Sequence, residues 1–85
     1  MTTTKKRGKT ATFKRCAELR ERAGLSVDAL VRLCGGRPGR SSIQRLERGE
    51  AVLVHNAFKV ASAVNAALLD VGASSFDIDD EVKRV

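Results

Sequence analysis

The sequence predicts an all-α fold, a compact bundle of four to five helices built as a single domain. A chain of 85 residues is enough for one hydrophobic core, and 42% of its residues are apolar. There is one Pro and no Trp or Tyr. The apolar residues are mostly Leu, Val and Ala, with few β-branched runs, which favours packed helices over a sheet.

The chain begins with residues 1–11, which are mainly Thr, Lys, Arg and Gly and are too polar to pack. This composition predicts a disordered basic arm. Thr12 suits the N-cap of a first helix over residues 13–23, because the apolar residues there recur at helical spacing. Gly24 suits the left-handed position that ends a helix.

Three more helices are expected. Ser26 suits the N-cap of the second helix, which ends at the glycine-rich segment 35–39. A third helix is predicted over residues 40–48, and residues 50–56 form a connection. A fourth helix follows to about residue 70, because apolar side chains there form one stripe: Phe58, Ala61, Val64 and Leu68.

These elements predict a domain over residues 12–71 and a separate C-terminal segment over residues 72–85. The alternation at the centre of this segment is compatible with a short strand, a last helical turn or a loose chain. Its apolar residues serve either to form a homodimer or to cover the protein's own core. We expect the homodimer, through Leu68, Leu69, Val71, Phe76 and Ile78.

The charge is unevenly distributed along the chain. Residues 1–50 carry 13 Lys and Arg against 5 Asp and Glu, whereas residues 51–85 carry 3 against 5. A basic half of this kind attracts polyanions, of which DNA is the commonest, although surface charge also serves solubility. With no signal peptide and no membrane span, and with Cys16 and Cys34 as buried thiols, the expected location is the cytoplasm.

The third predicted helix has two chemically different faces. Ile43 and Leu46 point to one side, and polar side chains point to the other. Arg pairs bidentately with guanine and Gln pairs with adenine, so such a face suits the reading of base edges. An ordinary solvated helix face has the same composition. The polar side chains are Arg40, Ser41, Gln44, Arg45 and Arg48.

The sequence resembles the lambda-repressor-like, Cro-type (XRE) helix-turn-helix family. The likeness covers roughly residues 13–69. The most specific segment is Ser42–Gly49, read as Ser-Ile-Gln-Arg-Leu-Glu-Arg-Gly. Further similarity lies in Leu19–Ser26, Ala29–Leu30 and Val60–Val64.

The resemblance implies that the third helix enters the major groove and that the second crosses the DNA backbone. Arg40, Ser41 and Arg45 match base-reading positions, with Gln44 and Arg48 close to bases or phosphates. Ser26 and Val27 match a phosphate contact. Arg20 and Glu47 match a structural ion pair between the first and third helices. The segment between Gly35 and Ile43 is longer than in the family, which affects the register of Arg37 to Ser41.

The basic arm carries Lys5, Lys6, Arg7 and Lys9, which either contact DNA or form a solubilising tail. One His and two Cys give no metal-site spacing, and no P-loop or catalytic motif is present. We therefore expect no enzyme activity, cofactor, metal or small-molecule substrate. The predicted function is a sequence-specific DNA-binding transcriptional regulator that acts as a repressor. The alternative is a protein-interaction module, antiactivator or antitoxin-like, on the same fold.

Overall fold

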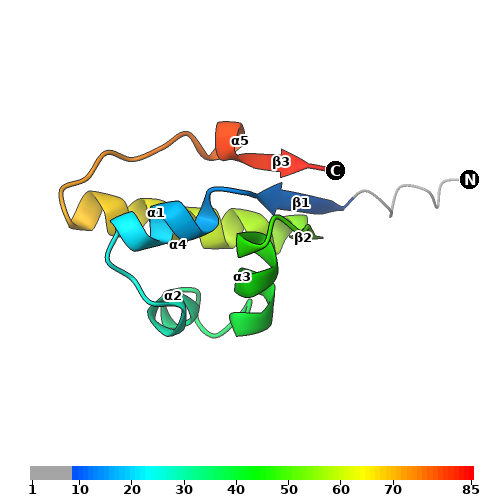
Figure 1. The fold of residues 1–85 in the computed structure, drawn as a ribbon, viewed down its shortest axis with the longest axis horizontal. Coiled ribbons are helices and arrows are strands. Elements are labelled where there is room, and N and C mark those ends of the chain that lie inside the picture. Colours follow the sequence, from blue (N-terminus) through cyan, green and yellow to red (C-terminus); the bar gives the residue numbers. More distant parts are fainter. Residues whose placement is uncertain (1–8) are drawn as a thin grey trace, which may run out of the picture.

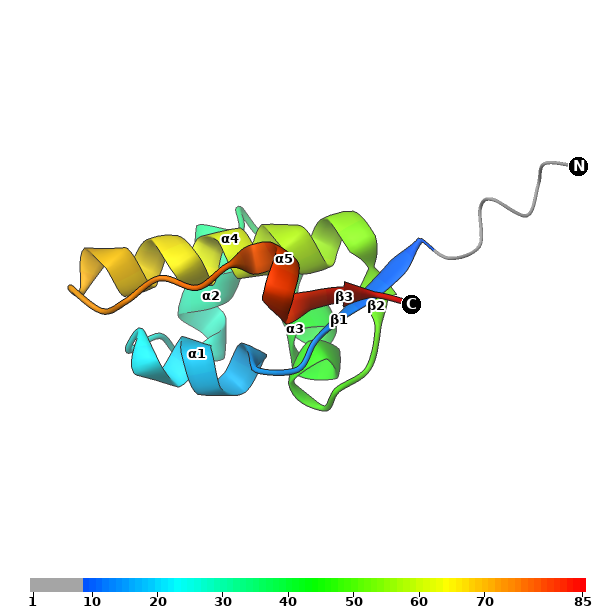
Figure 2. The same ribbon diagram turned by 90° about the horizontal axis from the view of Figure 1, so that it is seen from above.

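The computed structural model describes residues 9–85 and corrects the predicted all-α fold class. Within these residues, five helices pack with a three-stranded antiparallel sheet (Figures 1 and 2). The elements in order are β1 (Thr10–Phe13), α1 (Cys16–Arg22), α2 (Val27–Leu33), α3 (Arg40–Glu47), β2 (Val52–Leu53), α4 (Val54–Asp70), α5 (Ile78–Glu81) and β3 (Val82–Arg84).

The sheet joins three segments that are distant in the sequence. Strand β1 lies in the middle, with β2 on one side and β3 on the other. Ala11 pairs with Val52 in β2 and with Arg84 in β3. Residues 10–13, expected to end the arm and begin the first helix, therefore form a strand. Thr12 is buried in that strand and is not a helix cap.

The C-terminal segment predicted over residues 72–85 folds back onto the domain, which is the core-covering alternative of that prediction. The Phe76 ring stacks on Phe13 at 5.7 Å between centroids. The Asn65 side-chain amide donates to the Phe76 carbonyl at 3.1 Å, and its oxygen accepts from the Phe76 amide at 2.9 Å. Leu68 is fully buried, and Phe76 and Ile78 pack against the core. These three residues therefore contact this chain's own core, and the predicted homodimer stays a prediction.

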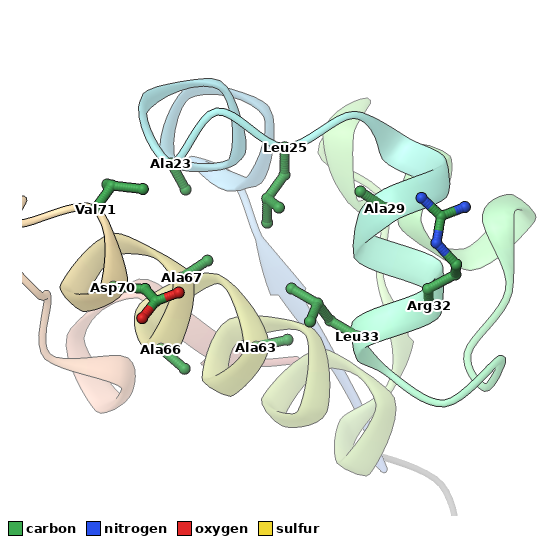
Figure 3. A pocket seen from close by; sticks show the side chains of 10 residues that line it. All are labelled: Ala23, Leu25, Ala29, Arg32, Leu33, Ala63, Ala66, Ala67, Asp70 and Val71. Carbon is green, nitrogen blue, oxygen red and sulfur yellow. The ribbon is translucent and has the colours of Figure 1, made fainter.

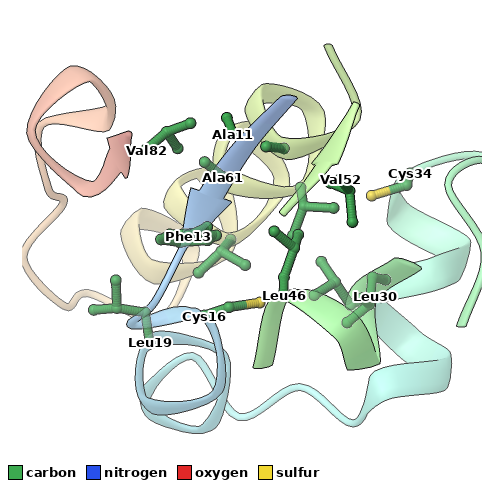
Figure 4. Packing of buried hydrophobic residues seen from close by; sticks show 14 of the residues in the cluster. Ala11, Phe13, Cys16, Leu19, Leu30, Cys34, Leu46, Val52, Ala61 and Val82 are labelled. Carbon is green, nitrogen blue, oxygen red and sulfur yellow. The ribbon is translucent and has the colours of Figure 1, made fainter. Parts of the chain in front are cut away.

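The core lies between β1, α4 and the inner faces of α1, α2 and α3 (Figure 4). Both thiols are free and buried in it, as expected, and burial raises the pKa of Cys16 to about 12. The expected connection over residues 50–56 instead contains β2 and the start of α4. The largest fully buried side chains are Phe13, Leu19, Leu30, Ile43, Leu46, Leu68, Val60, Val64 and Cys16.

The predicted ends of α2 and α3 agree with the structure. The Ser26 hydroxyl accepts a hydrogen bond from the Ala29 amide at 3.0 Å, which confirms the predicted N-cap. In the glycine-rich turn before α3, Gly35 and Gly36 adopt positive φ, and Gly39 is the N-cap of α3. The turn therefore ends at Gly39, and α3 begins at Arg40, as predicted.

Candidate nucleic-acid interface

Helix α3 is fixed to the protein by one face only. Ile43 and Leu46 are completely buried and anchor it in the core. Helices α2 and α3 lie together on the side of the molecule opposite α5 and β3 (Figure 1). The residues predicted to read DNA are all exposed on the outer face of α3 and at its C-cap: Arg40, Ser41, Gln44, Arg45 and Arg48.

An ion pair fixes α3 against α1. The Arg20 Nε donates to the Glu47 Oε2 at 2.6 Å, and only 13% and 17% of the two side chains are exposed. The Arg20 guanidinium also donates to the Leu25 carbonyl at 2.8 Å, so it joins α1, the following turn and α3. This pairing was predicted, and it is confirmed. The bond to Glu47 raises the pKa of Arg20.

The outer arginines are paired differently, with exposed carboxylates. Arg45 and Arg48 share Glu50, with Nε–oxygen distances of 3.4 Å and 3.0 Å respectively. Arg48, and to a lesser extent Arg45, lowers the pKa of Glu50. Arg40 pairs with Asp28 in the first turn of α2. Exposed pairs of this kind contribute little to folding stability, so a polyanion can replace the carboxylates at small cost.

Sequence reasoning did not identify Glu50 and Asp28 as partners of this face. Glu50 follows Arg48 by two residues, a spacing that gives no helical-face signal because α3 has already ended at Glu47. Asp28 and Arg40 lie on different helices, 12 residues apart. They meet because α2 and α3 pack against each other.

The predicted phosphate contact at the start of α2 stays a prediction. Ser26 is exposed, but its hydroxyl already caps the helix. Val27 packs against the core and offers only its backbone amide. Asp28 adds a negative charge at the same helix end, which opposes a phosphate unless Arg40 compensates.

The remaining predicted cations lie around α3 or near the first strand. Arg37 is exposed in the turn before α3. Lys9 is exposed beside β1, and its carbonyl accepts a hydrogen bond from the Val54 amide at 2.9 Å. Lys5, Lys6 and Arg7 lie outside the described residues.

Over residues 9–85, no group of three or more His, Cys, Asp or Glu side chains is placed to hold a metal ion. His55 is exposed on α4. In the same residues, no helix combines the length and apolar character needed to cross a bilayer.

Comparisons with family models, with curated proteins and with solved structures found no match to this chain. The family resemblance in the sequence therefore stays a prediction.

Proposed function

We propose that this protein binds double-stranded DNA through the outer face of α3 and regulates transcription as a repressor. The observation that carries the proposal is the two-sided construction of α3. One side is held by Ile43, Leu46 and the Arg20–Glu47 pair, and the other presents three arginines with Ser41 and Gln44. The interior contacts hold the helix in one orientation, and its exposed side has the chemistry of base recognition.

The size of α3 suits the major groove. Its eight residues span about 12 Å, similar to the groove width of about 12 Å. Arg45 and Arg48 lie three residues apart near the C-terminal end, so both are available for guanine edges or phosphates. Gln44 has the side chain that pairs with adenine. The helix-turn-helix resemblance of residues 42–49 supports the same interpretation.

In this proposal, the cations around the outer face of α3 contact the phosphates of the DNA backbone. Arg37 and Arg40 flank the start of α3, and the arm residues Lys5, Lys6 and Arg7 add positive charge at the N-terminus. Binding replaces the contacts of Arg40 with Asp28, and those of Arg45 and Arg48 with Glu50, by contacts with DNA. Because counterions leave the DNA at the same time, affinity should fall steeply with salt.

The test is the affinity for duplex DNA at several salt concentrations. Duplexes selected from a random pool and an unselected duplex of equal length would be compared by fluorescence anisotropy. We expect the selected duplex to bind at least about a thousandfold more tightly than the unselected one. Equal, weak binding to both duplexes would contradict the proposal.

That second outcome supports a protein-interaction module instead. One observation favours this alternative: an exposed apolar groove lies on the side of α2 that does not face α3. A module of this kind keeps its core and its ion pair, whereas its cationic helix serves solubility.

A further inference from the structure

An open apolar groove of about 560 Å³ lies between α2, the turn before it, and the second half of α4 (Figure 3). Leu25 and Leu33 form one wall, and Ala63, Ala67 and Val71 form the other. Leu33 is 55% exposed and Val71 is 60% exposed, although both are large and apolar. Such side chains are costly to leave in water beside one another.

Two opposite charges lie on opposite rims of this groove. Arg32 is in the last turn of α2, and Asp70 is the last residue of α4 (Figure 3). Within residues 9–85, neither side chain makes an ion pair or a hydrogen bond. Asp70 also lies at the negative end of a 17-residue helix that has no basic residue in its last turn. A cation from another molecule would therefore stabilise the Asp70 carboxylate.

We propose that the groove is a homodimer interface, and that its occupant is a second copy of this chain. A two-fold axis running between α2 and α4 places α2 of each copy over α4 of the other. Arg32 of one copy then meets Asp70 of its partner, and the same pair forms again across the axis. A surface that carries both charges on opposite rims is complementary to itself, as an isologous interface requires.

The apolar contacts follow the same symmetry. Leu33 of each copy lies over Ala63 and Ala67 of the other, where the small alanine side chains leave room for it. The groove is lined by residues of α2, of α4 and of the turns next to them, and by none from α3. Both α3 helices therefore stay exposed in the dimer. The inference concerns association of the protein alone and does not depend on DNA binding.

Charge reversal tests the interface directly. Arg32→Glu places two acids opposite each other in its own dimer, and Asp70→Lys places two bases opposite each other. An equimolar mixture of the two variants restores two opposite-charge pairs in the heterodimer. We expect wild type to sediment as a dimer at tens of micromolar, and each variant alone to dimerise about tenfold more weakly or worse. The mixture should recover the wild-type behaviour.

Controls separate the interface from folding. Leu33→Asp should abolish the dimer, whereas Leu53→Asp, which alters an exposed leucine of β2 outside the groove, should leave it intact. Circular dichroism melts show whether each variant is folded. The proposal is overturned if wild type is monomeric, if a folded Leu33→Asp variant dimerises like wild type, or if the mixed charge variants stay monomeric. A monomer that binds selected DNA tightly would overturn this interface and leave the proposed function standing.

Discussion

Both sides of α3 carry a pair of arginine and glutamate side chains, but the two pairs have different roles. On the inner side, Glu47 is 17% exposed and holds Arg20 at 2.6 Å. On the outer side, Glu50 is 47% exposed and is shared by two exposed arginines at 3.4 Å and 3.0 Å. A pair largely removed from water is part of the fold, because breaking it strands a charge. The outer pairs can exchange their carboxylate for a phosphate or a base edge.

The largest expected effect is on the inner side. Glu47→Ala leaves the Arg20 guanidinium partly buried without its carboxylate, so we expect a loss of about 3 kcal/mol in the free energy of unfolding. Chemical denaturation measures this loss. Glu21→Ala is the matched control, because Glu21 is an exposed acid 3.7 Å from the same arginine. The control should change stability by less than about 0.5 kcal/mol. Equal losses in the free energy of unfolding in both variants would mean that the inner pair contributes no more to folding than an exposed pair.

On the outer side, Arg45→Ala should affect binding and not stability. We expect a loss of about 1–3 kcal/mol in binding to selected DNA and a relaxed preference at one base position. The thermal melt should match wild type, because the Arg45 side chain is exposed. Arg22→Ala, which removes an exposed arginine of α1 that pairs with Glu18 on the same helix, is the control and should bind as wild type. An unchanged affinity and base preference in Arg45→Ala would remove that residue from the interface.

If the basic N-terminal arm contacts DNA, it adds to the DNA-binding surface formed by the outer face of α3. Removal of residues 1–8 keeps Lys9, whose carbonyl supports the start of α4. Because three cations are lost, the slope of log affinity against log salt should decrease in magnitude by about 2–3, with the preferred sequence unchanged. Titrations at four salt concentrations measure the slope. A slope identical to wild type would make the arm a solubilising tail.

The smallest effect is expected at the shared carboxylate. Glu50→Gln releases Arg45 and Arg48 and removes one negative charge, so affinity for every duplex should rise about twofold to fivefold. Glu18→Gln is a close control, because Glu18 also bridges two exposed arginines, but on α1. It should leave DNA binding unchanged. A weaker Glu50→Gln variant would mean that Glu50 orients the arginines and does not compete with DNA.

The sequence predicted those parts of the fold that depend on local spacing. The Ser26 cap, the two faces of α3 and the apolar stripe of α4 each follow from residues within a few turns of one another. The sheet does not. Its strands have four, two and three residues, and β1 pairs with segments about 40 and 70 residues away. Phe13 and Cys16 also have the spacing of one helix face, so the sequence pattern indicated a helix at Phe13, where the structure has a strand.

The candidate site likewise contains some residues that the sequence could identify and others that required the structure. The outer residues of α3 could be chosen from a helical wheel, because Ile43 and Leu46 fix its rotation. Arg20 and Glu47 were paired through the family resemblance, not through spacing. The contacts of Asp28 and Glu50 depend on how α2 and the chain after α3 are placed in space, which no local pattern specifies. The place of Phe76 on Phe13 likewise required the structure.

The central claim, that α3 reads the major groove, is tested most directly by methylation interference on selected DNA. Methylation of guanine N7 alters only the major-groove edge of the base pair. We expect it to block binding at specific guanines, and we expect Arg45→Ala to lose the interference at one of them while keeping the rest. Binding that tolerates methylation at every guanine of a guanine-containing site would contradict the claim.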